Sequence, residues 1–217
     1  MKKRLLIAAY LMLAISLAGC SSNGQFVPME YSVNGDQVRA ISIDVRDRKI
    51  DIGPSSDGLI YIDYYESNKE GYDIELTDTG ILSMTSVSNK DWTDFIGVKP
   101  SAGNRVISIR IPAGELDRFS IKTTNEDVSM QDLSTVGEIS ISSNGGNIRF
   151  ENLNAENSIS LNVKNGDING SIIGGYDDFS IHCDIKKGNS NLPNIDGGDK
   201  TLDVSCNNGD VNISFEN

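Results

Sequence analysis

The sequence has few histidines and few basic residues, and each shortage excludes a class of function. Among 217 residues there is one histidine, His182. A lone histidine without a placed nucleophile or second base does not make an acid–base catalytic site, so we expect the protein not to be an enzyme. The 19 basic residues are outnumbered by 31 acidic ones, which excludes nucleic-acid binding by neutralisation of phosphates.

Long apolar runs are also scarce, and the clearest one lies near the N-terminus. Leu5 to Leu17 is an apolar run of 13 residues, too short to span a bilayer as a helix and typical of a signal-peptide core. Three basic residues precede it, and Leu17-Ala-Gly-Cys20 follows it. We therefore predict that residues 1–19 are a signal peptide and not part of the fold.

The tetrapeptide that ends at Cys20 resembles the bacterial lipobox. This resemblance implies that Cys20 is acylated, with chains such as palmitate, and becomes the first residue of the mature protein. The alternative is an ordinary cleavage site with an incidental cysteine. Each buried acyl methylene contributes about 0.8 kcal/mol to membrane binding. Residues 20–37 are then the acylated cysteine and a tether.

Cleavage would make the protein still more acidic. Removal of Lys2, Lys3 and Arg4 leaves 16 basic and 31 acidic residues, a net charge of −15. Anionic headgroups would repel such a chain, so the lipid and not a basic patch would hold it on the membrane.

Residues 119–215 repeat themselves at a nearly constant spacing. Five segments share apolar residues at their first and third positions and polar residues at their second and fourth; they begin at Phe119, Ile139, Ile159, Phe179 and Leu202. Alternation with a period of two predicts strands with one buried and one exposed face. The first four starts are 20 residues apart and the last step is 23, and a fixed period in this range indicates a repeat architecture.

Turn residues such as Asn165-Gly-Asp and Asn208-Gly-Asp follow these strands, and Asn and Gly tolerate the left-handed backbone of a tight corner. Asn-Gly between strands is also typical of an antiparallel hairpin. The constant repeat favours a solenoid, because its coils stack at the strand spacing of about 4.8 Å. We predict an all-β, mostly parallel, single-stranded β-solenoid of about 20 residues per coil. One interior column would be Ile121, Ile141, Leu161, Ile181 and Val204.

The N-terminal half is less regular. Strand patterns in residues 38–84 drift in spacing and predict wide coils or a capping sheet. The link over residues 86–104 has no periodicity and holds Trp92 and Phe95. It is either a binding loop that presents both aromatic residues or a plug for an open end of the solenoid. Four tyrosines either form a stacking surface or pack on the flank of the fold: Tyr61, Tyr64, Tyr65 and Tyr72.

An apolar strand that ends in proline, Ile107-Ser-Ile-Arg-Ile-Pro112, is followed by coils with Asn-Gly-Asp corners. This arrangement resembles the bacterial putative-adhesin family of domains of unknown function. The resemblance covers about residues 38–217, although the corners Asn125-Glu-Asp and Gly145-Gly-Asn depart from its pattern. It implies a right-handed β-solenoid domain at the cell envelope, and it implies no established activity and no catalytic residue.

Two cysteines, Cys183 and Cys206, hold the fifth position of their repeats. Neighbouring coils would place their Cα atoms about 4.8 Å apart, within the range that a disulfide accepts. The pair is therefore either a disulfide of an extracytoplasmic protein or two buried thiols. We expect no metal at this pair, since no third or fourth ligand is placed.

Three further features are candidates for contacts. Four residues occupy the same position in the corners of successive repeats and predict a column that either binds calcium or accepts hydrogen bonds from the backbone: Asp127, Asn147, Asp167 and Asp210. Serines at the second position of the repeats predict a flat polar face: Ser120, Ser140, Ser160 and Ser180. Residues 186–200 interrupt the fourth coil and predict a protruding loop.

The sequence therefore predicts a lipid-anchored, extracytoplasmic lipoprotein on the plasma membrane or outer membrane. It would act as a non-enzymatic binding, adhesion or structural module of the cell envelope, without a cofactor or metal, and contact a cell-surface protein or glycan. One alternative is an envelope-stress or regulatory protein that acts through a protein partner. A less favoured alternative is a polysaccharide-acting β-helix enzyme.

Overall fold

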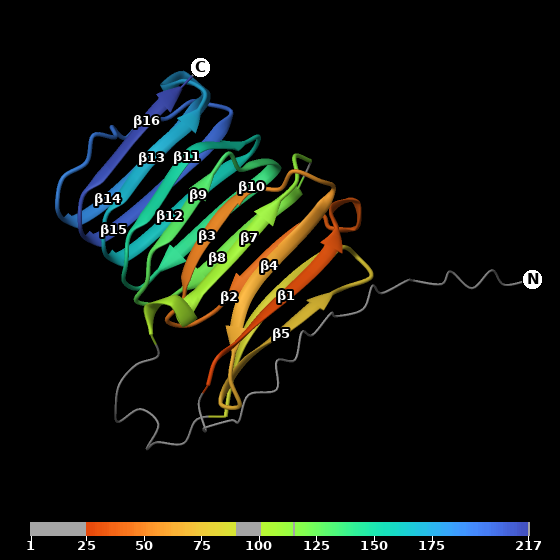
Figure 1. Cartoon of the computed structure of the whole chain (residues 1–217). Coiled ribbons are helices and arrows are strands. Elements are labelled where there is room, and N and C mark those ends of the chain that lie inside the picture. The colour runs from red at the N-terminus through yellow and green to blue at the C-terminus, as the bar shows by residue number, and fades with distance from the viewer. Residues whose placement is uncertain (1–24, 90–100, 115, 217) are drawn as a thin grey trace, which may run out of the picture.

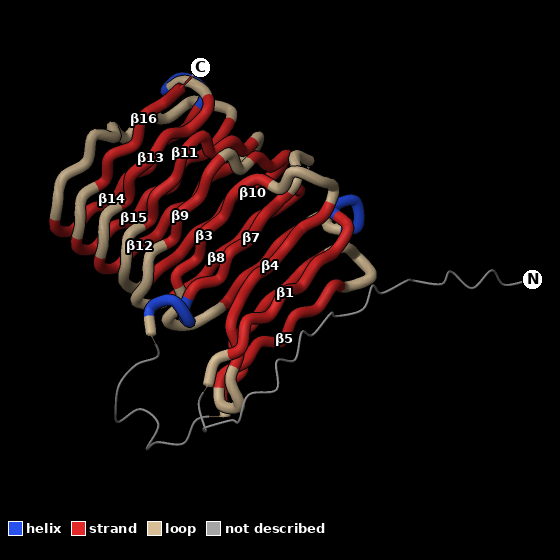
Figure 2. Tube along the Cα trace, viewed as in Figure 1, coloured by secondary structure: helices blue, strands red, loops and turns tan. Residues whose placement is uncertain are grey.

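The computed structural model describes residues 25–89, 101–114 and 116–216. Within these ranges sixteen strands form one mixed sheet, which folds into two layers that enclose the core (Figure 1). Strands run through both layers and loops occupy the corners and ends (Figure 2). Short 3-10 turns lie at Gly35–Gln37, Ala102–Arg105 and Tyr176–Asp178. Among the described residues, no helix is long and apolar enough to cross a membrane.

Layer A is one side of the solenoid. Its strands, in spatial order, are β1 (Val27–Asn34), β4 (Leu59–Glu66), β7 (Val106–Ile111), β3 (Lys49–Pro54), β9 (Val128–Gln131), β11 (Ile148–Ala155), β13 (Ile168–Ile173) and β16 (Val211–Glu216).

Layer B faces it, and pairing between β10 and β11 links the two layers. Its strands, in spatial order, are β5 (Glu70–Leu76), β6 (Ile81–Ser88), β2 (Ala40–Asp44), β8 (Leu116–Thr123), β10 (Ser134–Ser143), β12 (Ser158–Asn165), β15 (Lys200–Asn208) and β14 (Phe179–Lys187).

The regular coils stack as their alternation predicts. In layer B, Ile141 of β10 lies opposite Ile121 of β8 and Leu161 of β12, in parallel strands. These three side chains are each about 1% exposed. The period-two pattern therefore places its apolar positions in a dry interior, and the interior column is confirmed as far as Leu161.

Beyond Leu161 the predicted order of the column is wrong. β15 pairs with β12, and β14 lies outside β15, so Leu161 faces Val204 and not Ile181. The reason is the missing second strand of the fourth repeat: after β14 the chain forms no strand in layer A until β16, which pairs directly with β13. A coil that lacks one strand fits at the end of the stack and not in its middle.

Glycines at one corner fix how closely the coils approach. Gly146, Gly166, Gly209 and Gly188 all have positive φ, between 86° and 150°. A Cβ atom on Gly166 would lie 2.2 Å from the carbonyl oxygen of Gly146, and one on Gly209 would lie 2.1 Å from that of Gly166. Because any side chain at these four positions would push the coils apart, a glycine at this corner is a requirement of the stacking.

The N-terminal half departs from parallel winding. The pairs β1·β4, β4·β7 and β5·β6 are antiparallel, so the sheet is mixed. Part of the expected tether also belongs to the fold, since Val27–Asn34 forms β1 and pairs with β4 along its whole length. The alternating residues of this strand, partly buried at Met29, Tyr31 and Val33, pack against the core.

The segment between β14 and β15 caps the C-terminal end and does not protrude as predicted. Ile195 exchanges backbone hydrogen bonds with Ile181 at the edge of β14, at 3.0 and 2.7 Å. The side chain of Asn191 donates to the carbonyl of Ile213 at 2.8 Å and accepts from its N–H at 3.0 Å. Leu192 between them is 8% exposed. The cap pairs edge groups that would otherwise be open to another chain.

Candidate functional site

The outer face of layer B carries a row of five serines, one from each of five neighbouring strands. Backbone register places Ser83, Ser42, Ser120, Ser140 and Ser160 opposite one another, in that order. All five are partly exposed, because they occupy the outward position between two buried apolar residues. Their hydroxyl-bearing carbons therefore repeat at the strand spacing, about 4.8 Å.

Ser180 is not part of this row, contrary to prediction. It lies opposite Thr201, and the row continues from Ser160 to Asp203 and His182. Ser42 and Ser83, by contrast, were missed from the sequence. The signal was present, since both stand between apolar residues as in the later repeats, in Ile41-Ser-Ile43 and Leu82-Ser-Met84.

Small side chains also flank the C-terminal part of the row. Ser142, Asn162 and Ser205 lie in register on one side, and Ser158 and Thr201 on the other. Nearer the N-terminus the flanking residues are long and paired across strands: Arg118 with Glu138 at 3.0 Å, and Lys122 with Asp44 at 3.1 Å. The result is a flat hydroxyl- and amide-rich surface, which we call the serine face.

The row brings a serine, an aspartate and a histidine together, but not in a catalytic arrangement. Asp203 stands between Ser160 and His182. A nucleophilic triad needs the histidine between the other two, within hydrogen-bond reach of the serine. Here the histidine is two strand spacings from the serine, or about 10 Å. Both Asp203 and His182 are exposed, so water would also compete for any proton transfer.

The predicted column of corner residues is present, and its oxygens serve the backbone. Oδ1 of Asp127 accepts from the N–H of Asn147 at 2.7 Å, and Oδ1 of Asn147 accepts from the N–H of Asp167 at 2.9 Å. The column continues through Asp210 to Asn189, at 2.9 and 2.8 Å. Each side chain thus ties one coil to the next, which supports the structural interpretation over calcium binding. No group of three or more His, Cys, Asp or Glu side chains that could hold a metal ion occurs in the described parts of the chain.

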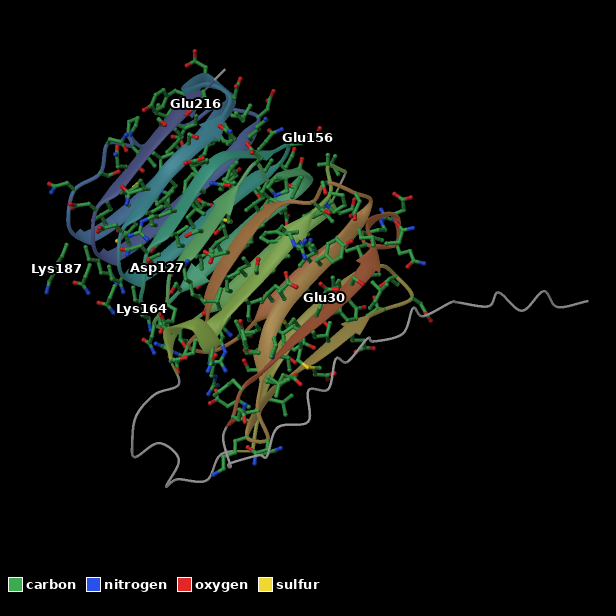
Figure 3. All side chains as sticks on the ribbon, viewed as in Figure 1. Glu30, Asp127, Glu156, Lys164, Lys187 and Glu216 are labelled. Atoms are coloured by element: carbon green, nitrogen blue, oxygen red, sulfur yellow. The ribbon has the colours of Figure 1, made fainter. Side chains whose placement is uncertain are left out.

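Asp127 accepts three hydrogen bonds, more than the other members of the column, from the N–H and side-chain amide of Asn147 and from Arg149. Partial burial would raise the pKa of its carboxyl, but hydrogen bonds from the Asn147 N–H and the Arg149 guanidinium outweigh burial and hold the pKa below its usual value. Asp127, Lys164 and Lys187 lie along one edge of the solenoid, and Glu156 and Glu216 along the opposite edge (Figure 3).

The two cysteines are free, and the register on which the disulfide prediction depends is wrong. Cys183 lies opposite Val204, whereas Cys206 lies opposite Ile185 and Val163. Cys206 is fully buried, and burial raises the pKa of its thiol. It therefore acts as a small core residue of the kind that the alternative described.

The tyrosines pack on the flank of the N-terminal half. Tyr64 is 4% exposed, contacts the ring of Tyr72 edge-on at 5.3 Å, and burial raises its pKa to about 12. Tyr72 in turn bonds to the buried Arg48, whose guanidinium pairs with Glu70 at 2.7 Å. Tyr61 donates to Asp57 at 2.8 Å and lies beneath Arg110. For Tyr61, Tyr64 and Tyr72, these contacts favour the packing interpretation over a stacking surface.

Three candidate residues, Cys20, Trp92 and Phe95, lie outside the described residues. Their predicted roles in lipidation and in binding stay predictions.

The architecture defines a class: a two-layered, solenoid-like β domain built from stacked strand repeats. The chain belongs to the Toastrack family, DUF4097, which matches residues 38–217. This agrees with the putative-adhesin resemblance noted from the sequence.

One solved structure shares the fold, and another shows a weaker similarity. A structure described as "a putative cell adhesion protein" from Clostridium sporogenes has a TM-score of 0.60 and 13% identity, and the match covers 88% of this chain and 100% of that one. A "putative adhesin" from Bacteroides fragilis gives a TM-score of 0.40 at 14% identity, covering 91% and 100%. The first of these supports the fold, and no curated protein matches the chain.

Proposed function

We propose that this protein is a non-enzymatic, adhesion-like module of the cell envelope that contacts its partner through the serine face. The observation that carries the proposal is the five-strand serine row with its small flanking residues. A surface made of serine, threonine and asparagine loses little side-chain entropy when it is covered. The names of the similar structures, a cell adhesion protein and an adhesin, point to the same use.

The outward residues of β12 and β15 on this face lack the aromatic and arginine anchors that dominate tight protein interfaces. Each contact is therefore expected to be weak, and useful adhesion would come from many copies acting together. Display on a membrane places many copies side by side. Linked weak sites then bind more tightly together than singly, because each raises the effective concentration of the next. We propose that the acylated Cys20 anchors the protein on the outer side of a membrane for this purpose.

We also propose that the coils wind right-handed with about 20 residues each.

The test compares one copy with many. The domain is measured for binding to intact bacterial cells, first as a soluble monomer and then coupled densely to beads. We expect the beads to bind about 100-fold more tightly than the monomer. Replacement of Ser140 by Tyr should abolish bead binding, because a bulky ring breaks the flat surface. Bead binding that survives this replacement would contradict the proposal.

The regulatory alternative keeps the same anchor but assigns the chain a single protein partner. Cross-linking on cells with recovery of one membrane protein in equal amount would favour it. The enzyme alternative is disfavoured by the positions of Ser160, Asp203 and His182, and release of sugar fragments from a polysaccharide would revive it.

A further inference from the structure

Layer A carries a second feature, a groove on the side of the molecule opposite the serine face. It has a volume of about 690 Å³ and crosses β3, β9, β11 and β13. Its polar lining comes from outward side chains at successive coils: Asp51, Ser129, Gln131, Arg149, Glu151 and Asn169. Asp51, Ser129, Arg149 and Asn169 lie in register across the four strands, so the groove runs along the axis of the solenoid.

The groove lies next to a stacked irregularity in the strands. β11 places Glu151 and Asn152 where β13 has one residue, Ser171, which is a β-bulge. Asn152 has φ of 54° and its neighbour Asp132 has φ of 51°, a conformation uncommon outside glycine. The side chain of Asn152 donates to Asp132 at 2.7 Å, and its N–H donates to Ser171 at 3.0 Å. Bulges of this kind re-aim side chains beside functional sites.

The groove has spare hydrogen-bonding capacity. Over the described ranges, the side chains of Gln131, Glu151 and Asn169 have no hydrogen-bond partner in the protein. One guanidinium nitrogen of Arg149 donates to Asp127 at 2.6 Å. Half of the Arg149 side chain is exposed, and its other N–H groups remain available to a ligand in the groove. The corner column thus fixes Arg149 in place while amides and a carboxylate face open space beside it.

Charge narrows the class of ligand. The lining holds two carboxylates, one guanidinium and two amides, in a protein that carries 31 acidic and 19 basic residues. An anionic polymer would be repelled. Closely spaced amide, carboxylate and guanidinium groups suit a ligand that donates and accepts hydrogen bonds at every unit, and coils at about 4.8 Å repeat at nearly the length of one sugar residue.

We propose that this groove binds a neutral glycan chain, lying along the solenoid axis with successive sugars on successive coils. The proposal adds a second binding site to the serine face and is independent of it. Gln131 and Asn169 would bond sugar hydroxyls on either side of Arg149. The glycan lies across the strands and needs no movement of the backbone.

The test uses isothermal titration of the domain with three neutral hexasaccharides, the β-1,4-linked hexamers of glucose, mannose and N-acetylglucosamine, and with hexagalacturonate as the acidic comparison. We expect one neutral hexamer to bind with Kd at or below about 1 mM, and hexagalacturonate to bind at least tenfold more weakly. Binding of no neutral hexamer in that range, or tighter binding of hexagalacturonate, would overturn the proposal.

Variants locate the site. Ser129→Tyr places a ring in the groove and should abolish hexamer binding, whereas Ser140→Tyr makes the same change on the serine face and should leave it intact. Asn169→Ala should weaken binding about tenfold through one lost hydrogen bond, and Asn162→Ala on layer B is its matched control. Circular dichroism confirms that each variant folds.

The same pair of variants separates the two proposals. Loss of cell adhesion in Ser140→Tyr with retained hexamer binding supports both sites. Loss of hexamer binding in Ser140→Tyr but not in Ser129→Tyr would move the glycan to the serine face and refute the groove while leaving the adhesive function standing.

Discussion

The two halves of the molecule are held together by different means. From β8 onward, one small set of contacts recurs along the coils: an inward apolar pair and an aspartate or asparagine that accepts from the next backbone N–H, joined from β10 onward by a glycine corner. Before β8, where the sheet includes antiparallel pairs, side-chain contacts occur once each, such as the buried pair between Arg48 in the β2–β3 connection and Glu70 of β5. The comparison teaches that a repeat spreads its stability over many equivalent sites, whereas the irregular half depends on a few.

The largest effect is expected at the glycine corner of the regular half. Gly166→Val should prevent native stacking, because its Cβ would lie 2.2 Å from the Gly146 carbonyl and its φ is 148°. We expect a loss of about 4 kcal/mol or more in the free energy of unfolding, measured by denaturant titration. Gly53→Ala is the control in the other half, where an added Cβ has nothing within 4 Å. Equal stability of the two variants would show that the corner does not limit the stack.

Arg48→Met tests the irregular half. The Arg48 and Glu70 side chains are 6% and 13% exposed, so the change removes the guanidinium from a buried carboxylate and from the Tyr72 hydroxyl. The expected loss is about 3 kcal/mol, seen as a lower midpoint in the same titration. Arg39→Met breaks an exposed pair with Asp117 and should cost at most about 1 kcal/mol. A loss for Arg48→Met no greater than that would mean that the buried pair is dispensable.

Asn191→Ala opens the cap at the C-terminal end. It removes two hydrogen bonds to the backbone of Ile213 on β16, and we expect about 2 kcal/mol of destabilisation. The exposed edge should also associate with other chains, so light scattering should detect oligomers at concentrations where the wild type is monomeric. Asn194 lies in the same segment, and its side-chain oxygen accepts a hydrogen bond from the Cys183 N–H on β14. The Asn194→Ala variant is the control, because it should leave the β16 edge covered and the protein monomeric.

The smallest effect concerns pH and the corner column. The pKa of Asp127 is lowered in the folded state, so its contribution is present above the unfolded pKa of about 3.9 and is lost as pH falls through the lower folded value. Asp127→Asn keeps an acceptor for the Asn147 N–H without a titrating group. The stability of the variant should therefore fall less steeply between pH 5 and pH 3 (about the range in which carboxyls titrate). Parallel curves for the two proteins would contradict a held carboxylate.

How much could be predicted from sequence depends on whether a feature repeats. The stacking of Ile121, Ile141 and Leu161 follows from period-two alternation and the 20-residue step. The position of β14 does not follow from the sequence pattern, because its residues resemble those of the other repeats. Only the absence of a second strand after β14 places it at the end of the stack. The strand Val27–Asn34 lies within the residues predicted to be a tether, although Met29, Tyr31 and Val33 alternate with polar residues, because a strand that pairs with distant β4 belongs to no sequence repeat.

The candidate sites divide in the same way. The serine row could be read from the repeats, and its extension to Ser42 and Ser83 required only the same pattern in the irregular half. The groove could not be predicted from the sequence, because it depends on the bulge at Asn152 and on the register that places outward residues of four strands side by side. The register of Cys183 and Cys206 could not be predicted either, because it depends on the order of β14 and β15 in the sheet.

The place of β1 at one end of layer A has a geometric consequence. Four residues separate Cys20 from Gln25, where the described chain begins, and the five Cα–Cα steps between them span at most about 18 Å. If Cys20 carries the proposed lipid, the end of the domain formed by β1 would lie nearest the bilayer. The coils would then extend away from the membrane, and the cap around Asn191 would be the part of the domain farthest from it.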